Sequence, residues 1–85
     1  MMKFKVKVTV MLKKSVLDPQ GAAVERALKS HGDAGLESVR IGKVIEIVLE
    51  GSDAASVEKR AAEWADKLLA NPIMEIYTIT VEALA

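Results

Sequence analysis

The stretch Leu-Glu-Ser-Val-Arg-Ile-Gly-Lys-Val-Ile-Glu-Ile-Val-Leu-Glu, residues 36–50, decides the fold. From residue 38 onward the odd positions are apolar on both sides of Gly42-Lys43. A two-residue hairpin at Gly42-Lys43 would place an acidic residue on the core face and break this alternation. A single strand over 38–50 that pivots at Gly42 preserves the pattern, as does a three-residue turn. We favour the single strand.

A second strand is predicted at the start of the chain, over residues 3–13. Five apolar residues alternate there with three lysines, a threonine and a methionine, and this period of two is typical of a strand with one buried face. The expected buried set is Phe4, Val6, Val8, Val10 and Leu12. We expect the lysines opposite them to be solvated, with a partner surface as the alternative.

The first helix is predicted over residues 19–31. Asp18 is a favoured N-cap residue, and Pro19 suits the first helical position. Gly32 can adopt the left-handed conformation that ends a helix. Apolar side chains and the single histidine share one face of this helix: Val24, Ala27, Leu28 and His31.

The second helix is predicted over residues 54–70, between the N-cap Asp53 and the stop signal Asn71-Pro72. Its apolar stripe comprises Val57, Ala61, Trp64 and Leu68. A last strand follows over residues 74–82. Both of its faces are moderately apolar, so we expect it to be covered on both sides.

The resulting order is β-α-β-α-β within a single domain, residues 1–85. Two helices on one face of a small antiparallel sheet make a two-layer α+β sandwich. A strand over 38–50 would span about 40 Å, whereas a 13-residue helix covers only about 20 Å. We therefore expect the long, bent central strand to be shared between two chains, which form ferredoxin-like units in an intertwined dimer.

Composition excludes several kinds of chemistry. The 85 residues contain no cysteine and one histidine, so a disulfide, a thiol nucleophile or a Cys/His metal cluster is not expected. The net charge is zero, and the first 14 residues carry five lysines and no acidic residue. The three aromatic residues do not form an RNA-recognition pattern. With no phosphate-binding glycine motif and no long apolar run, we expect no metal, cofactor, nucleic-acid or membrane partner, and a cytoplasmic location.

Four features, three of them sequence motifs and the fourth the chain length, together resemble one known family. A lysine-rich first strand leads into Val-Leu-Asp-Pro-Gln-Gly, and Val-Arg-Ile-Gly-Lys is followed closely by Ile-Glu. Leu-Leu-Ala-Asn-Pro then precedes Ile-Met-Glu-Ile-Tyr. These segments are residues 16–21, 39–43, 45–46, 68–72 and 73–77. In content, order and chain length they resemble the PurS family of bacterial and archaeal phosphoribosylformylglycinamidine synthase.

The resemblance implies a subunit that is not catalytic alone. Such a subunit joins a small synthetase subunit (small PurL), which binds ATP and formylglycinamide ribonucleotide, to a glutaminase subunit (PurQ). The complex produces formylglycinamidine ribonucleotide in the fourth step of purine biosynthesis, using ammonia released from glutamine. It also implies a homodimer or homotetramer.

The motif residues fall into two groups, candidates for contact with a partner subunit and residues expected to be structural. Arg40 and Lys43 flank Gly42 and could contact a partner or be simply solvated, and Asp18 is a third interface candidate. The remaining motif residues are expected to be structural: Pro19, Gly21, Gly42, Asn71 and Pro72.

Two other classes share this element order. An ACT-like domain that senses a small molecule would need a true hairpin at residues 41–45 and a ligand site at a dimer interface. A small enzyme of the acylphosphatase kind would need an arginine in a phosphate-binding loop and an asparagine on a nearby strand. The single asparagine, Asn71, is expected at a helix end, which disfavours that enzyme.

Overall fold

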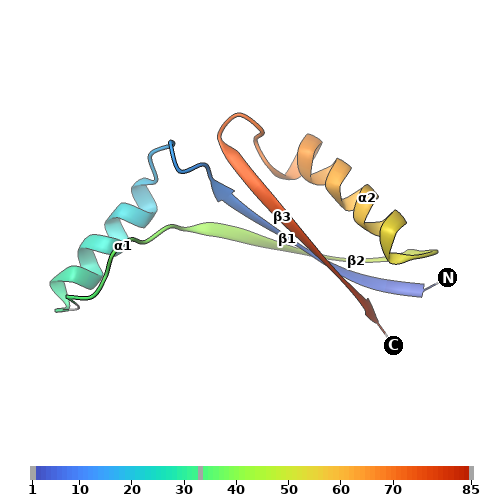
Figure 1. Ribbon diagram of the computed structural model, residues 1–85, viewed down its shortest axis with the longest axis horizontal. Helices are drawn as coiled ribbons and strands as arrows, with labels where there is room; N and C mark the ends of the chain where they lie inside the picture. The colour runs from blue at the N-terminus through green and yellow to red at the C-terminus, as the bar shows by residue number, and fades with distance from the viewer. Residues whose placement is uncertain (1, 33, 85) are drawn as a thin grey trace.

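The computed structural model describes residues 2–32 and 34–84. It confirms the α+β class and the order β-α-β-α-β, as Figure 1 shows. The second helix ends in a π-helical turn, η1, so the predicted range 54–70 is nearly matched by two consecutive elements. The elements are β1 (Met2–Leu12), α1 (Pro19–Ser30), β2 (Gly42–Gly51), α2 (Ala54–Trp64), η1 (Ala65–Leu69) and β3 (Glu75–Leu84).

The three strands form one antiparallel sheet in the order β2-β1-β3. The alternation predicted for β1 is confirmed for Phe4, Val6, Val8 and Val10, which are all buried, whereas Leu12 at the end of the strand is only half-buried. Val6 lies opposite Ile47 of β2 and Val81 of β3. The hydrophobic core therefore lies along one face of β1.

Helix α2 and the η1 turn that continues it cover this inner face with small residues. Val57, Ala61 and Ala65 are fully buried, and they recur every fourth position. The predicted stripe was wrong in its second half, since Leu68 is 78% exposed and Trp64 is half-buried. Alanine at position 65 lets the helix approach the strands closely, while the Trp64 ring lies at the side of the helix under the Arg60 guanidinium, 5.5 Å from it.

Strand β2 differs from the prediction in its start and position. It begins at Gly42 instead of residue 38. It lies at an edge of the sheet, whereas β1 is the central strand. The physical reason is the register: Gly42 pairs with Met11 and β1 ends one residue later, so residues 38–40 have no strand to pair with, and Ile41 donates its N–H to Asp18. From Gly42 the strand runs unbroken to Gly51, which resolves the choice between strand and hairpin.

Strand β3 also differs from its prediction. We expected a strand covered on both faces, but β3 is the other edge of the sheet. Its inner face carries Tyr77, Ile79 and Val81, which pack against the core. Its outer face is exposed and includes Ile76. Among residues 2–32 and 34–84 no second layer covers that outer face, and the apolar character there comes mainly from one end of the strand.

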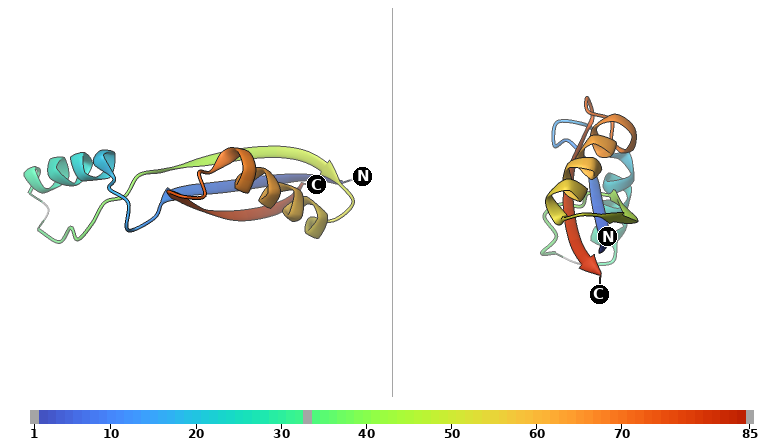
Figure 2. Two further views of the ribbon diagram at one scale, coloured as in Figure 1. Left: turned by 90° about the horizontal axis from the view of Figure 1, so that it is seen from above. Right: turned by 90° about the vertical axis from the view of Figure 1, so that its right-hand side faces the viewer.

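Helix α1 lies beyond the end of the sheet, although we expected both helices on one face (Figures 1 and 2). The connections over residues 13–18 and 31–41 carry it outward past the ends of β1 and β2. The radius of gyration is 16.5 Å, compared with about 12 Å for a compact domain of this length. Within the described part of one chain, therefore, α2 with η1 forms the second layer, and Val24 and Leu28 on the apolar face of α1 remain exposed.

Candidate assembly surface

Asp18, Arg40 and Lys43 lie together where α1 meets the sheet. The Asp18 carboxylate accepts hydrogen bonds from the backbone N–H of Gly21 and of Ile41, both at 2.9 Å. These two bonds, with a smaller contribution from the positive charge of Arg40, lower the pKa of the Asp18 carboxyl. Asp18 and Lys43 also line one open hollow of about 230 Å³. The structure thus gathers the three interface candidates at one junction.

The two basic residues differ in their surroundings. Arg40 is half-buried, and within the part of the chain that the structure describes its Nη2 atom is buried without a hydrogen-bond partner. Lys43 is exposed and lies opposite Val10 of β1. A buried, unpaired guanidinium nitrogen is costly, so Arg40 has an unused capacity to donate a hydrogen bond.

Three of the residues expected to be structural lie at the same junction. Pro19 is the first residue of α1. Gly21 is buried, and a Cβ atom there would lie 2.7 Å from the Val39 carbonyl oxygen. A Cβ on Gly42 would collide with the Met11 side chain, and Gly42 does not have a positive φ. These two glycines allow neighbouring atoms to approach the backbone closely, and neither supplies a left-handed backbone conformation.

Asn71 and Pro72 form a separate, well-bonded turn between η1 and β3. The Asn71 side-chain oxygen accepts from the backbone N–H of Ile73 at 3.0 Å. The Glu75 carboxylate accepts from the backbone N–H of Asn71 at 2.6 Å. Pro72 and Glu75 line a second open hollow of about 310 Å³ with Lys13 and other residues. The turn is therefore rigidly built.

Sequence reasoning missed the apolar surface around this turn. Leu68 is 78% exposed and Ile73 is 79% exposed, with Met74 and Ile76 also on the surface. The available signal was a run of apolar residues on both sides of a helix stop, where polar residues are usual. Clustered exposed apolar residues commonly mark interaction surfaces.

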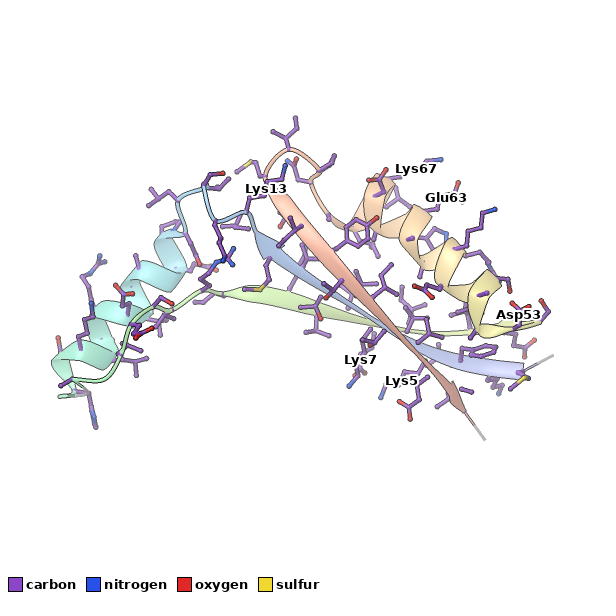
Figure 3. The ribbon with its side chains drawn as sticks, viewed as in Figure 1. Lys5, Lys7, Lys13, Asp53, Glu63 and Lys67 are labelled. Atoms are coloured by element: carbon purple, nitrogen blue, oxygen red, sulfur yellow. The ribbon has the colours of Figure 1, made fainter. Side chains whose placement is uncertain are left out.

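Two of the three lysines on β1 are paired with an acidic residue across the sheet. Lys5 and Lys7, which are labelled in Figure 3, both approach the Glu46 carboxylate of β2, at 3.5 Å and 3.8 Å. On the outside of α2, Lys67 pairs with Glu63 at 3.1 Å. Part of the positive charge near the N-terminus is therefore balanced across the sheet, which weakens the electrostatic attraction that nucleic acid would need.

The geometry also bears on other kinds of site. Residues 2–32 and 34–84 contain no group of three or more metal-ligating side chains. No helix among these residues is long and apolar enough to cross a membrane. The hairpin at 41–45 that an ACT-like domain requires is absent from the described strands, because β2 is continuous there. Asn71 lies in a turn and not on a strand, unlike the asparagine of an acylphosphatase-like site.

Fold and surface together define a class: a small, elongated α+β interaction domain whose first helix stands away from its own core. Residues 5–83 match the family described as PurS, phosphoribosylformylglycinamidine (FGAM) synthase. The chain belongs to this family, whose members are subunits of that ligase.

Similar proteins cover nearly the whole chain. The phosphoribosylformylglycinamidine synthase subunit PurS of Bacillus subtilis is 48% identical over 79 residues, 93% of either chain. The PurS subunit of Methanocaldococcus jannaschii is 38% identical over 81 residues, 95% of this chain and 98% of the relative.

Solved structures show the same fold. PurS of Thermus thermophilus matches with a TM-score of 0.86 and 40% identity, covering 98% of this chain and 99% of the other. PurS of M. jannaschii, one of the subunits of formylglycinamide ribonucleotide amidotransferase, also has a TM-score of 0.86, at 35% identity, over 96% and 99%. A chain in the structure of PurLQS from Thermotoga maritima matches with a TM-score of 0.84 and 28% identity, over 99% and 100%.

Proposed function

We propose that this chain is the non-catalytic assembly subunit of a glutamine-dependent, cytoplasmic FGAM synthase. It joins the synthetase subunit (small PurL) to the glutaminase subunit (PurQ), so that ammonia released from glutamine reaches the synthetase. The complex converts formylglycinamide ribonucleotide, glutamine, ATP and water to formylglycinamidine ribonucleotide, glutamate, ADP and phosphate. The observation that carries this proposal is the full-length similarity to a chain of the Thermotoga PurLQS structure.

The proposal includes a homodimer, or a tetramer built from dimers. Val24 and Leu28 of α1 are 38% and 43% exposed, and they lie on a helix that has no sheet beneath it (Figure 1). The inner face of the sheet has one covering helix, whereas a complete two-layer unit has two. A second copy supplies the missing helix if each chain places its helix α1 over the sheet of the other. The elongated shape favours this arrangement.

Arg40 and Lys43 are proposed to contact a partner subunit. Both lie at the base of α1, and Arg40 has a buried nitrogen without a hydrogen-bond acceptor in the described part of the chain. A carboxylate or carbonyl oxygen of a partner would satisfy that nitrogen. Exposed charge pairs contribute only about 0–1 kcal/mol each, so a double substitution is needed to see the effect.

The test is reconstitution of glutamine-dependent FGAM formation from the three purified subunits. We expect the chain alone to hydrolyse neither glutamine nor ATP, and the synthetase and glutaminase to need it for efficient glutamine use. Excess ammonia should reduce that need, because the chain contributes assembly and transfer. Equal glutamine-dependent rates with and without the chain, together with no co-elution in gel filtration, would contradict the proposal.

A double charge reversal addresses the interface. Arg40→Glu with Lys43→Glu should weaken co-elution and glutamine-dependent synthesis while the circular dichroism spectrum is retained. A matched double reversal at Lys3 and Lys59, two lysines without an ion pair in the structure, controls for net charge. Equal behaviour of the two double variants would remove Arg40 and Lys43 from the interface.

A further inference from the structure

The Asp18 carboxylate joins two segments that are far apart in the sequence. Its Oδ1 atom accepts from Gly21 N in the first turn of α1, and its Oδ2 atom accepts from Ile41 N, 23 residues away. Ile41 immediately precedes β2. One side chain therefore caps α1 and at the same time ties the helix to the point where the chain returns to the sheet.

The surroundings of Asp18 make this tie tight. The backbone of Gly21 lies so close to the Val39 carbonyl that a Cβ atom on Gly21 would sit 2.7 Å from that oxygen. The same Cβ would collide with the Asp18 carboxylate. The positive charge of Arg40 lies near enough to favour the ionised carboxylate. The segments that enter and leave α1 are thus held together at the base of that helix.

The other helix cap in the chain provides a contrast. Asp53, labelled in Figure 3, accepts from Ser56 N at 2.8 Å in the first turn of α2. Its side chain accepts no hydrogen bond from a distant segment, among the bonds of the described residues. Helix α2 does not need such a tie, because Val57 and Ala61 bury it against the sheet. Helix α1 lacks that packing, so its direction depends on its two connections.

We propose that Asp18 is the positioning residue that fixes the direction of α1 relative to the sheet, and so presents the uncovered face of α1 to a second copy of the chain. This inference rests on the proposed homodimer. Holding α1 in the docking direction before association reduces the conformational entropy that is lost on binding. In the absence of the tie, α1 would sample several directions, and association would be weaker without any change in the contacts themselves.

Asp18→Asn separates the tie from the cap. Asparagine and serine are good N-cap residues, so Asp18→Asn and Asp18→Ser both preserve the bond to Gly21. Neither side chain has a second acceptor oxygen for Ile41 N. Asp53→Asn is the matched control, because it makes the same chemical change at a cap without a long-range tie. Circular dichroism should show full helix content in all three variants.

Two measurements report on the tie directly. The Ile41 amide should exchange with solvent about tenfold faster or more in Asp18→Asn and Asp18→Ser than in the parent, since the bond to a charged acceptor is lost. The chain has no cysteine, so spin labels can be placed by Ser30→Cys on α1 and Glu58→Cys on α2. Diluted with unlabelled protein, the parent and Asp53→Asn should give one narrow distance distribution, and Asp18→Asn a broad one.

The outcomes separate this inference from the proposed function. Ile41 exchange and label distances in Asp18→Asn and Asp18→Ser that equal those of the parent would overturn the positioning role, whether or not the chain dimerises. If the tie is broken but the dimer dissociation constant is unchanged, the link from the direction of α1 to association is refuted. If the parent does not dimerise, the proposed homodimer fails, while exchange and distances still decide whether Asp18 holds α1. A loss of helix content in Asp18→Ser as well as Asp18→Asn would show that Asp18 is only a folding residue.

Discussion

Truncation of Leu28 tests whether a second chain covers the exposed face of α1. Leu28 remains 43% exposed in the single chain. Full burial of a leucine side chain contributes about 1.5–3 kcal/mol, so covering the exposed part contributes about 1 kcal/mol. A symmetric dimer has two such helices, which gives up to about 2 kcal/mol for Leu28→Ala. The dimer dissociation constant should therefore rise by about 30-fold.

Sedimentation velocity over a concentration series measures this constant. Leu28→Ala does not lower helix propensity, so α1 itself should persist. Val48→Ala is the control, because Val48 is an apolar residue that is 61% exposed on the outer face of β2, toward the end of the strand that lies away from α1. We expect it to leave the dimer unchanged. A Leu28→Ala dissociation constant equal to that of the parent would refute the assignment of α1 to the dimer interface.

The same association should make the melting temperature depend on protein concentration. A tenfold increase in concentration stabilises a dimer by about 1.4 kcal/mol. Two chains of 85 residues have an unfolding entropy of about 0.36 kcal/mol/K. The melting temperature should therefore rise by about 4 °C for each tenfold increase. A melting temperature that is independent of concentration would contradict a dimer coupled to folding.

Three further predictions concern the fold. Ile47→Asp should leave the chain unfolded by circular dichroism, because a carboxylate on the inner sheet face costs several kcal/mol, comparable to the ~5 kcal/mol expected of so small a domain; a folded variant would contradict the assigned face. Gly42→Val should cost about 1–3 kcal/mol, because the new Cβ meets both the Val10 carbonyl oxygen and the Met11 side chain; an unchanged melting temperature would show that β1 moves aside freely. Hydrogen bonds to the backbone lower the pKa of Asp18 and Asp53, so their stabilisation is complete above the ordinary carboxyl pKa and is lost as pH falls below about 4. Asp18→Asn should reduce the loss of stability at low pH in thermal melts, and a pH profile identical to that of the parent would contradict the contribution of the Asp18 carboxylate.

The parts of the fold that were predicted correctly depend on local patterns. In β1 the alternation of apolar and charged residues specifies which face is buried, and all four of its first apolar residues are buried as expected. In β2 the odd positions Ile45, Ile47 and Leu49 pack on the core, also as the alternation indicates. The helix N-caps were also predicted correctly, because the side chains of Asp18 and Asp53 each accept a hydrogen bond from a backbone N–H in the first turn of the helix that follows.

The parts that were predicted wrongly depend on pairing between distant segments. The alternation continues through Val39 and Ile41, yet the strand begins at Gly42, because β1 ends one residue beyond the partner of Gly42. The second bond of Asp18, to Ile41, could not be read from the sequence either, since nothing in the local pattern relates two residues that are 23 positions apart. The edge position of β3 has the same origin, because strand order follows from pairing and not from composition.

Helix α1 shows a further limit on what a pattern can specify. The spacing of Val24 and Leu28 predicts an apolar face, but a face that must be covered does not state which chain covers it. Covering by the chain's own sheet would require short connections that fold back, whereas the Asp18 tie holds the base of the helix at the end of β2, away from the core. A helix fixed in that direction can bury its apolar face only against another molecule. Asp18 caps α1 through one carboxylate oxygen, and under the positioning role proposed above its second oxygen directs the apolar face of α1 toward a second chain.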